Sequence, residues 1–309
     1  MPWPAHAQAD TAEQIVNVMN KLWGVHPGFR ANHAKGVVVE GTFTPAPEAA
    51  KLSRAAIFKG GAIPVTVRFS DSTGLPAIPD GTPGANPHGM AIIFHGPGGE
   101  VDVVTNSLKF FPVATGEDFR DLLTAFGQSG PNAPKPTPAE KFFATHPAVP
   151  AALATVATPE SFATETYNGV DAFIFVNAAG KRQPFRFRID PAAGTHHLAP
   201  EQAAKQAPDF LLSELPQRLA KGPVTFTLRA QLAQPGDPTK DPTKPWPASR
   251  TLADIGTITL TKADANSLDA QKKLVFLPNN LQDGIEPSDD PLIDTRSEAY
   301  AISFSRRSQ

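Results

Sequence analysis

An arginine and a tyrosine lie four residues apart near the end of the sequence, in Arg296-Ser297-Glu298-Ala299-Tyr300. On a helix this spacing places the guanidinium of Arg296 beside the phenol of Tyr300. A neighbouring cation favours the phenolate form of tyrosine, and a phenolate can bind ferric iron, including the iron of haem. Because such pairs are also common on helix surfaces, the two residues form either a surface contact or the iron-binding part of a haem site.

The sequence before this pair predicts the helix that would carry it. Asp290 has the side chain of an N-cap, and Pro291 suits the first helical position. Arg307 follows Tyr300 by seven residues, so the two side chains share roughly one face of the predicted helix.

Composition limits the partners that this helix could have. The chain has 309 residues, of which 40% are hydrophobic and 19% charged, as in an ordinary globular protein. The formal net charge of −2 gives no electrostatic reason to expect nucleic acid or an anionic membrane as a partner. No apolar run approaches the length needed to span a bilayer. We therefore expect neither nucleic acid nor membrane as a partner.

The sequence contains no cysteine. This excludes disulfides, iron–sulfur clusters, thiolate ligation of haem and thiol-based peroxidase chemistry. Other oxidisable side chains are also few, with 3 Met, 3 Trp and 2 Tyr against 20 Phe. This composition would suit a protein exposed to peroxide, and it would equally follow from a phenylalanine-rich core.

Ala5-His6-Ala7 has the small-x-small form of a signal-peptidase site, although no basic or apolar signal region precedes it. Either an export signal was removed before this chain was made, or the match is accidental. Our interpretation leans towards the first, which favours the periplasm over the cytoplasm.

The hydrophobic pattern predicts helices and short strands in alternation. The first helix is expected to begin at Thr11, whose side chain would form a capping box with Gln14. Further helices are predicted at 118–126, 138–143 and 209–219, the second of them capped by Thr137 with Glu140. Strands are predicted at 37–44, 64–70, 90–94, 101–104, 172–177, 184–189, 224–232 and 255–260. The chain shows no repeat and no clear boundary, so we expect one α+β domain.

Seven segments, in order, resemble the haem catalase family. They are His33-Ala34-Lys35-Gly36, Pro64-Val65-Thr66-Val67-Arg68-Phe69-Ser70, Asn86-Pro87-His88-Gly89-Met90-Ala91, Asp102-Val103-Val104-Thr105-Asn106, the segment 169–177, Pro242-Thr243-Lys244-Pro245-Trp246-Pro247 and Gly284-Ile285-Glu286-Pro287-Ser288. The match runs from about Gly28 to Arg307, nearly the whole chain. Its short length resembles the catalase-related peroxidases, the minimal core of the family.

The resemblance implies an antiparallel β-barrel with flanking helices, and haem b buried between the barrel and the C-terminal helix. We expect residues 1–309 to form a single haem domain, in which 1–27 is an N-terminal helix or arm and no C-terminal extension follows. Because the long arm and helical domain of full catalases are missing, the resemblance favours a monomer or a homodimer over the catalase tetramer.

Family roles carried onto matching positions assign the distal side of the haem. His33 would move a proton between the two peroxide oxygens, and its ordinary pKa near neutrality suits that role. Asn106 would orient the peroxide through its amide, and Ser70 would fix the imidazole tautomer.

The resemblance also assigns the residues that would hold the haem. Tyr300 would bind the iron as a phenolate, and Arg296 would keep that ligand anionic. The planar forks of the propionate-binding arginines suit carboxylates. Phe119 would stack on the haem. The propionate-binding arginines are Arg30, Arg68 and Arg307.

Two positions depart from the family pattern. Asn32 stands where full catalases have a small apolar residue, and it could hydrogen-bond the distal water or the histidine. His88 stands where they have arginine, which puts the electrostatics near the pocket in question. We therefore predict a peroxidase that reduces hydrogen peroxide or organic hydroperoxides through a ferryl intermediate with small organic electron donors, and that has weak catalase activity.

Three alternatives remain open from the sequence. The protein could be a true catalase, which would evolve oxygen faster than it oxidises any organic donor. It could be a fatty-acid hydroperoxide rearranging enzyme, because coral allene oxide synthases resemble the same core and also have a polar residue beside the distal histidine. It could also bind haem without catalysis, although His33 and Asn106 argue against that because storage needs neither.

Overall fold

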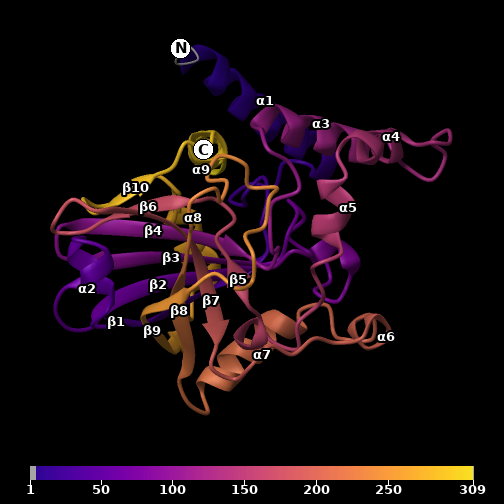
Figure 1. Cartoon of the computed structure of the whole chain (residues 1–309). Helices are drawn as coiled ribbons and strands as arrows, with labels where there is room; N and C mark the ends of the chain where they lie inside the picture. Colours follow the sequence, from indigo (N-terminus) through magenta and orange to yellow (C-terminus); the bar gives the residue numbers. More distant parts are fainter. Residues whose placement is uncertain (1–4, 309) are drawn as a thin grey trace.

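Eight antiparallel strands close into a barrel in the computed structural model, which describes residues 5–308 and only the backbone of residues 5–9 (Figure 1). The strands follow the order β7-β5-β4-β3-β2-β1-β9-β8, and β8 pairs with β7 to complete the circle. Their bounds are β1 Gly36–Pro45, β2 Ile63–Ser70, β3 Gly89–Gly96, β4 Gly99–Asn106, β5 Tyr167–Asn168, β7 Arg182–Pro191, β8 Val224–Leu232 and β9 Leu252–Ala263. This confirms the predicted α+β fold with a catalase-like barrel.

Two further strands extend the sheet beyond the closed barrel. Strand β6 (Phe173–Val176) pairs with the first part of β7, and β10 (Ile285–Pro287) pairs with β6. The sequence pattern predicted neither the two-residue β5 nor the three-residue β10, because each is too short to show an alternation.

Side chains on alternate positions of the strands fill the barrel. In β8 the buried positions are Val224, Phe226, Leu228 and Ala230, and the residues between them are only partly buried. This alternation is what a strand with one covered face requires. Phenylalanines dominate the interior, as in the edge-to-face contact of Phe43 and Phe94, whose ring centres lie 5.0 Å apart.

Helices lie against the outside and one end of the barrel. The long ones are α1 (Ala5–Trp23), α3 (Gly116–Gly127), α7 (Phe210–Leu219) and α9 (Leu292–Arg307). Shorter ones are α2 (Ala49–Leu52), α4 (Pro138–Thr145), α5 (Ala148–Leu153), α6 (Pro200–Ala203) and α8 (Ser267–Lys273), with 3₁₀ turns at Ala56–Phe58, Pro83–Ala85 and Phe162–Thr164. No helix among the described residues is long and apolar enough to cross a bilayer.

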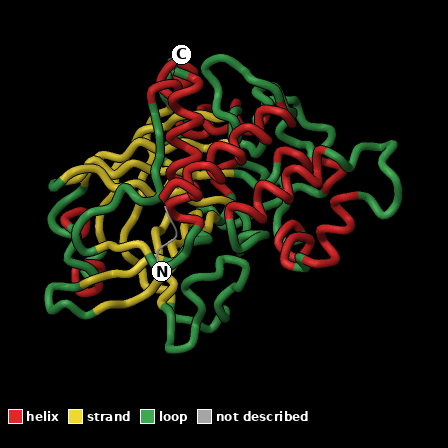
Figure 2. Tube along the Cα trace, turned by 90° about the horizontal axis from the view of Figure 1, so that it is seen from above, coloured by secondary structure: helices red, strands yellow, loops and turns green. Residues whose placement is uncertain are grey.

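Helix α1 packs on both α3 and α9, and α3 packs on α4. Seen from above, the strands gather on one side of the molecule and most of the helices on the other (Figure 2). Helix α7 lies at the opposite side of the barrel from α9 (Figure 1). The interface between the barrel, α1, α3 and α9 is where the predicted site residues meet.

The predicted start of the first helix at Thr11 is wrong. Helix α1 begins six residues earlier, because the alanine-rich stretch before Thr11 contains no helix breaker. Thr11 therefore lies inside the helix, and its hydroxyl donates to Glu117 of α3 at 2.9 Å. The Ala5-His6-Ala7 match lies in the first turn of α1, where only the backbone is described, and residues 1–4 of the predicted arm lie outside the described part.

Of the two other predicted caps, one agrees with the structure and one is displaced by a residue. Thr137 and Glu140 form the reciprocal capping box of α4. Helix α9 starts one residue later than predicted, with Pro291 rather than Asp290 as its N-cap. The side chain of Asp290 nevertheless accepts the backbone N–H of Leu292 at 2.9 Å, so it satisfies the first turn as an N-cap side chain does.

Candidate active site

One cavity contains all nine predicted site residues on its walls. It lies among β2, β3, β4, α1, α3 and α9, and its empty volume is about 1150 Å³, open solvent included. The nine residues are Arg30, His33, Arg68, Ser70, Asn106, Phe119, Arg296, Tyr300 and Arg307. Residues from positions 30 to 307 thus line the same cavity, although they belong to several different helices, strands and loops.

His33 occupies a loop just before β1 and has a left-handed backbone conformation, with φ of 55°. This region is uncommon for residues with a side chain, and histidine is among the few types enriched there. Neighbours fix the conformation from both sides. The amide N–H of His33 donates to Asn32 Oδ1 at 3.0 Å, and its carbonyl accepts from Arg68 Nη2 at 2.7 Å.

The imidazole of His33 is held on one edge only. Its Nδ1 lies 3.1 Å from the hydroxyl of Ser70, the last residue of β2. Gly89 of β3 admits the ring, since a Cβ on Gly89 would lie 3.2 Å from His33 Nδ1 and 2.9 Å from Ser70 Oγ. Burial, followed by the positive charge of Arg68, lowers the pKa of His33 to about 3. The imidazole is therefore neutral at physiological pH, and it is available as a base.

Asn106 ends β4 and pairs with Gly89 across the β3–β4 ladder. Its side-chain oxygen accepts the backbone N–H of Leu108 at 2.9 Å, which fixes the orientation of the amide. The amide nitrogen of Asn106 makes no hydrogen bond to any other described residue, and the residue lines the cavity. This leaves a donor free for a bound molecule.

Three arginines gather at one side of the cavity. Arg30 donates to the carbonyls of Gln271 and Leu274 at 3.1 and 2.8 Å, and Arg307 donates to the same Leu274 carbonyl. Arg68 donates through Nε to the side chain of Gln271 at 2.9 Å. The C-terminal end of α8 and the residue after it thus supply neutral acceptors that tie the three cations together.

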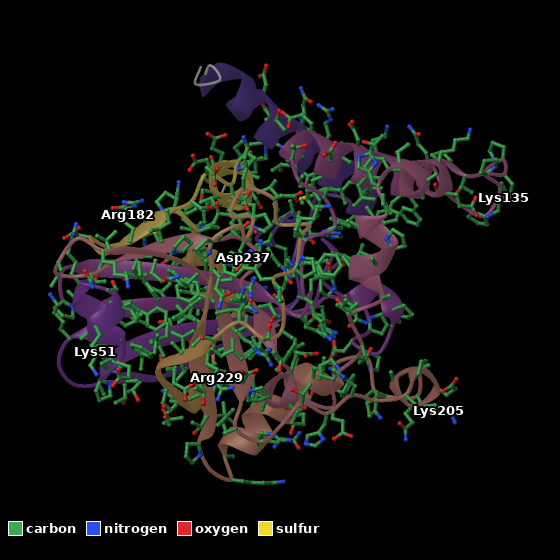
Figure 3. All side chains as sticks on the ribbon, viewed as in Figure 1. Lys51, Lys135, Arg182, Lys205, Arg229 and Asp237 are labelled. Carbon is green, nitrogen blue, oxygen red and sulfur yellow. The ribbon has the colours of Figure 1, made fainter. Side chains whose placement is uncertain are left out.

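The charges of the three arginines are not neutralised by the protein. No carboxylate within residues 5–308 forms a salt bridge with Arg30, Arg68 or Arg307, whereas surface lysines such as Lys51 and Lys135 are paired and point outward at the margins of the molecule (Figure 3). Burial lowers the pKa of Arg68 to about 9 and that of Arg307 to about 10.

This cluster fits a ligand that brings two carboxylates. Buried like charges without partners are costly, so a dianion would stabilise the site. The Nε of Arg307 is buried and has no acceptor among the described residues. The two propionates of a haem have the charge and the planar acceptors that such a cluster needs.

Tyr300 of α9 also lines the cavity, and its oxygen accepts a hydrogen bond from Arg296 Nε at 3.2 Å. Arg296 also forms an ion pair with Asp171, which is 2% exposed. Although burial alone lowers the pKa of Arg296, the Asp171 carboxylate and the Tyr300 oxygen raise it above its ordinary value. The guanidinium therefore stays charged beside the Tyr300 oxygen.

Asp290 lies behind this ion pair. Burial and the neighbouring Asp171 raise the pKa of Asp290 to about 8. The side chain of Arg186, stacked over Trp246 at 4.5 Å, is a second cation in this region. The protonated form of Asp290 therefore leaves Asp171 as the one carboxylate of the pair that neutralises Arg296.

His88, whose replacement of arginine put the electrostatics near the pocket in question, does not line the cavity. It is fully buried behind Gly89, and its Nδ1 lies 3.0 Å from Asp71. Burial lowers the pKa of His88 to about 4, so it is neutral. Asp71 in turn lies 4.0 Å from the ammonium of Lys35, which also forms ion pairs with Asp80 and Asp209.

Several wall residues were not predicted as part of the site. Ile15, Val16 and Met19 of α1 line the cavity, and the sequence predicted a helix there without assigning any of them to the site. Gln271 and Asp171 give no local signal, because they act through partners more than 100 residues away in the sequence. Phe119 was predicted and lies on α3, with its ring 5.5 Å from that of Phe111.

Comparison with known proteins gives one family. The family model described as catalase matches residues 28–308. The chain is 36% identical to the catalase-related peroxidase of Mycolicibacterium paratuberculosis, over 96% of this chain and 95% of that protein. It is 33% identical to the catalase-related peroxidase of Synechococcus elongatus, over 97% of this chain and 89% of that protein. A bacterial catalase structure superposes with a TM-score of 0.81 at 23% identity, covering 91% of this chain and 58% of the other.

Proposed function

The chain belongs to the catalase family of oxidoreductases that act on peroxide, and from this premise we propose that it is a haem-dependent peroxidase with weak catalase activity. Catalase-family proteins bind haem, and we propose haem b for this chain, held in a single domain. Its substrates would be hydrogen peroxide or organic hydroperoxides, with small organic molecules as electron donors.

The unpaired arginine cluster that lines the same cavity as Tyr300 is the observation that carries this proposal. Tyr300 would hold the iron through its phenolate oxygen, and Arg30, Arg68 and Arg307 would hold the propionates. Phe119 would pack against the macrocycle from α3. When bound, the haem iron supplies the electrons that cleave the oxygen–oxygen bond of the peroxide.

On the distal side, we assign the proton of His33 to Nδ1, which donates to Ser70 Oγ. The lone pair on Nε2 is then free to accept a proton from one peroxide oxygen and to return it to the other, which leaves as water. The low pKa of His33 suits a group that gives the proton back readily. The free amide N–H of Asn106 would hold the peroxide during this transfer.

On the proximal side, Arg296 and Asp171 keep the charge of Tyr300 constant. A hydrogen bond from a guanidinium stabilises the phenolate and reduces the electron density that it donates. Asp171 neutralises that guanidinium. Arg296 can therefore remain charged next to the phenolate without competing with the iron for its electron density.

Asn32 supports peroxidase over catalase activity. Its side-chain oxygen is occupied by the backbone N–H of His33, so its amide nitrogen is the group that it can offer to the cavity. We propose that this donor holds a water molecule beside His33 and slows the productive approach of a second peroxide. One-electron donors would not be affected, since they need no access to the distal side.

The test is an absorption spectrum of the haem-loaded protein during titration with peroxide and then with an organic donor. We expect a high-spin ferric spectrum that changes with one equivalent of peroxide and returns after two equivalents of donor. Oxygen release that exceeds donor oxidation at all donor concentrations would instead indicate a true catalase. Rearranged products from a lipid hydroperoxide would indicate the allene oxide synthase alternative, and a spectrum that ignores peroxide would indicate haem binding without catalysis.

A further inference from the structure

A second pocket adjoins the arginine cluster from the outside. It lies between the loop Pro27–Arg30 and helix α8, and its empty volume is about 550 Å³, open solvent included. We propose that this pocket binds the electron donor, and that the donor it prefers is a small aromatic anion. The inference rests on the proposed peroxidase function, since it names the substrate class for that reaction.

The two pockets share a wall. Arg30 lines both of them, and Gln271 lines the outer pocket while accepting hydrogen bonds from Arg30 and Arg68. A molecule in the outer pocket would therefore contact Arg30, which we assign to a propionate, and Gln271, which accepts a hydrogen bond from Arg68. An electron donated there would enter beside Arg30, one of the residues that would hold the haem, and the donor would not have to pass the apolar wall of α1.

The charges of the outer pocket favour an anion. Its charged lining residues are Arg30 and Lys272, and no Asp or Glu lines it. Because the proposed function assigns Arg30 to a propionate, Lys272 is the lining cation that remains for a donor. Lys272 pairs only with Asp269, and both side chains are at least half exposed, so the pair contributes little and can exchange for a ligand.

The apolar part of the pocket favours a flat ring. Phe29 and Leu268 form its walls, and the side chain of Leu268 is 62% exposed. The stem of Lys272 lies across Gly28, where a Cβ would be 3.2 Å from Lys272 Cε and where φ is +80°. Apolar walls with one or two cations at the edge are typical of sites for small organic anions.

The reaction balances with this donor. Each phenolic donor loses one electron and one proton from its hydroxyl group, leaving a phenoxyl radical. Two donors reduce one hydrogen peroxide, whose oxygens leave as two waters. The electrons enter at the outer pocket, and the protons are released to solvent or taken up on the distal side by way of His33.

The experiment compares two lysines that differ by one position on α8. Lys272 lines the pocket, while Lys273 is also exposed but does not line it, so Lys272→Glu and Lys273→Glu make the same change of net charge. The donors are 4-hydroxy-3-methoxyphenylacetate, an anion, and the neutral 2-methoxy-4-methylphenol. We expect Lys272→Glu to raise the KM of the anion about tenfold and that of the neutral donor less than about twofold. Lys273→Glu should change both by less than about twofold.

A binding measurement without peroxide separates this inference from the proposed function. Proton NMR relaxation of the anion should be enhanced by the ferric haem protein, and Lys272→Glu should reduce the enhancement while Lys273→Glu should not. Equal effects of the two variants on KM and on relaxation would overturn the donor site. If the wild-type protein relaxes the anion but oxidises neither donor, the pocket stands and the peroxidase proposal fails.

Discussion

On the distal side of the cavity, the imidazole of His33 is held by groups without net charge, whereas on the proximal side Tyr300 is held by a buried ion pair. The imidazole of His33 contacts the hydroxyl of Ser70, and the nearby His88 is buried and neutral. Tyr300 contacts Arg296, whose charge is fixed by Asp171.

The difference matches what each side has to do in the proposed reaction. A group that accepts and returns a proton must be neutral at rest and must release the proton again, and the low pKa of His33 favours its neutral form. A ligand that keeps one charge through the whole cycle gains from neighbours that hold it in place. The predictions below test this contrast, from the largest expected effect to the smallest.

Tyr300→Phe removes the proposed proximal ligand and should abolish haem binding and all peroxide turnover. We expect haem affinity to fall by more than about 100-fold, since even the loss of an outer partner can reach that value. Haem content after reconstitution measures this. The control is Tyr167→Phe, which removes one hydrogen bond to the Phe162 carbonyl inside the barrel and should cost only about 1 kcal/mol of stability.

His33→Ala removes the proton-transfer group and should leave haem binding intact. The rate of reaction with hydrogen peroxide should fall about 10²- to 10⁴-fold, the usual contribution of a general acid–base residue. Stopped-flow absorbance measures this rate, and haem content measures binding. An unchanged peroxide rate would show that the distal side plays no chemical part and would favour haem storage.

Asp171→Asn removes the charge that fixes Arg296 and should weaken haem binding by about 10- to 100-fold, without altering the distal side. Asp290→Asn is the matched control. Because the raised pKa of Asp290 keeps its carboxyl largely protonated at neutral pH, an amide there should change haem affinity much less. Equal losses in the two variants would contradict the assignment of Asp171 as the partner that neutralises Arg296.

The neutrality of His88 should appear in the pH dependence of stability. The unfolded chain binds a proton at the ordinary histidine pKa near 6.5, while folded His88 does not until about pH 4. The contribution of His88 to the free energy of unfolding is therefore complete above pH 6.5 and decreases as the pH falls. At pH 5 about 2 kcal/mol of it is lost. His88→Gln should reduce the loss between pH 7 and pH 5 by that amount in urea unfolding. His196→Gln, at an exposed position, should leave the loss unchanged.

The sequence predicted the fold and brought together nine residues that line one cavity, because their segments resemble a known family. It did not predict the partners that tune them. Asp171 and Gln271 contact their arginines across more than 100 residues of sequence, and no local spacing reports such a contact. His88 shows the opposite case, since its position in a recognised segment was clear but its burial away from the cavity could be seen only in three dimensions.

Errors in the predicted elements also have local causes. The start of α1 was placed at Thr11 because a threonine followed three residues later by glutamine imitates a capping box. In the structure the threonine hydroxyl contacts Glu117 of α3 instead, so a contact between helices determined its role.

Helices α1 and α9 stand on two sides of the cavity and pack against each other, although the whole barrel sequence lies between them. During synthesis on the ribosome, the barrel strands therefore emerge before the cavity has its second wall. The chain can enclose a prosthetic group only after α9 has been made and has met α1. Acquisition of the group is thus tied to a late step of biogenesis, and a cell short of that group would accumulate chains whose barrel is formed but whose two flanking helices lack their shared ligand.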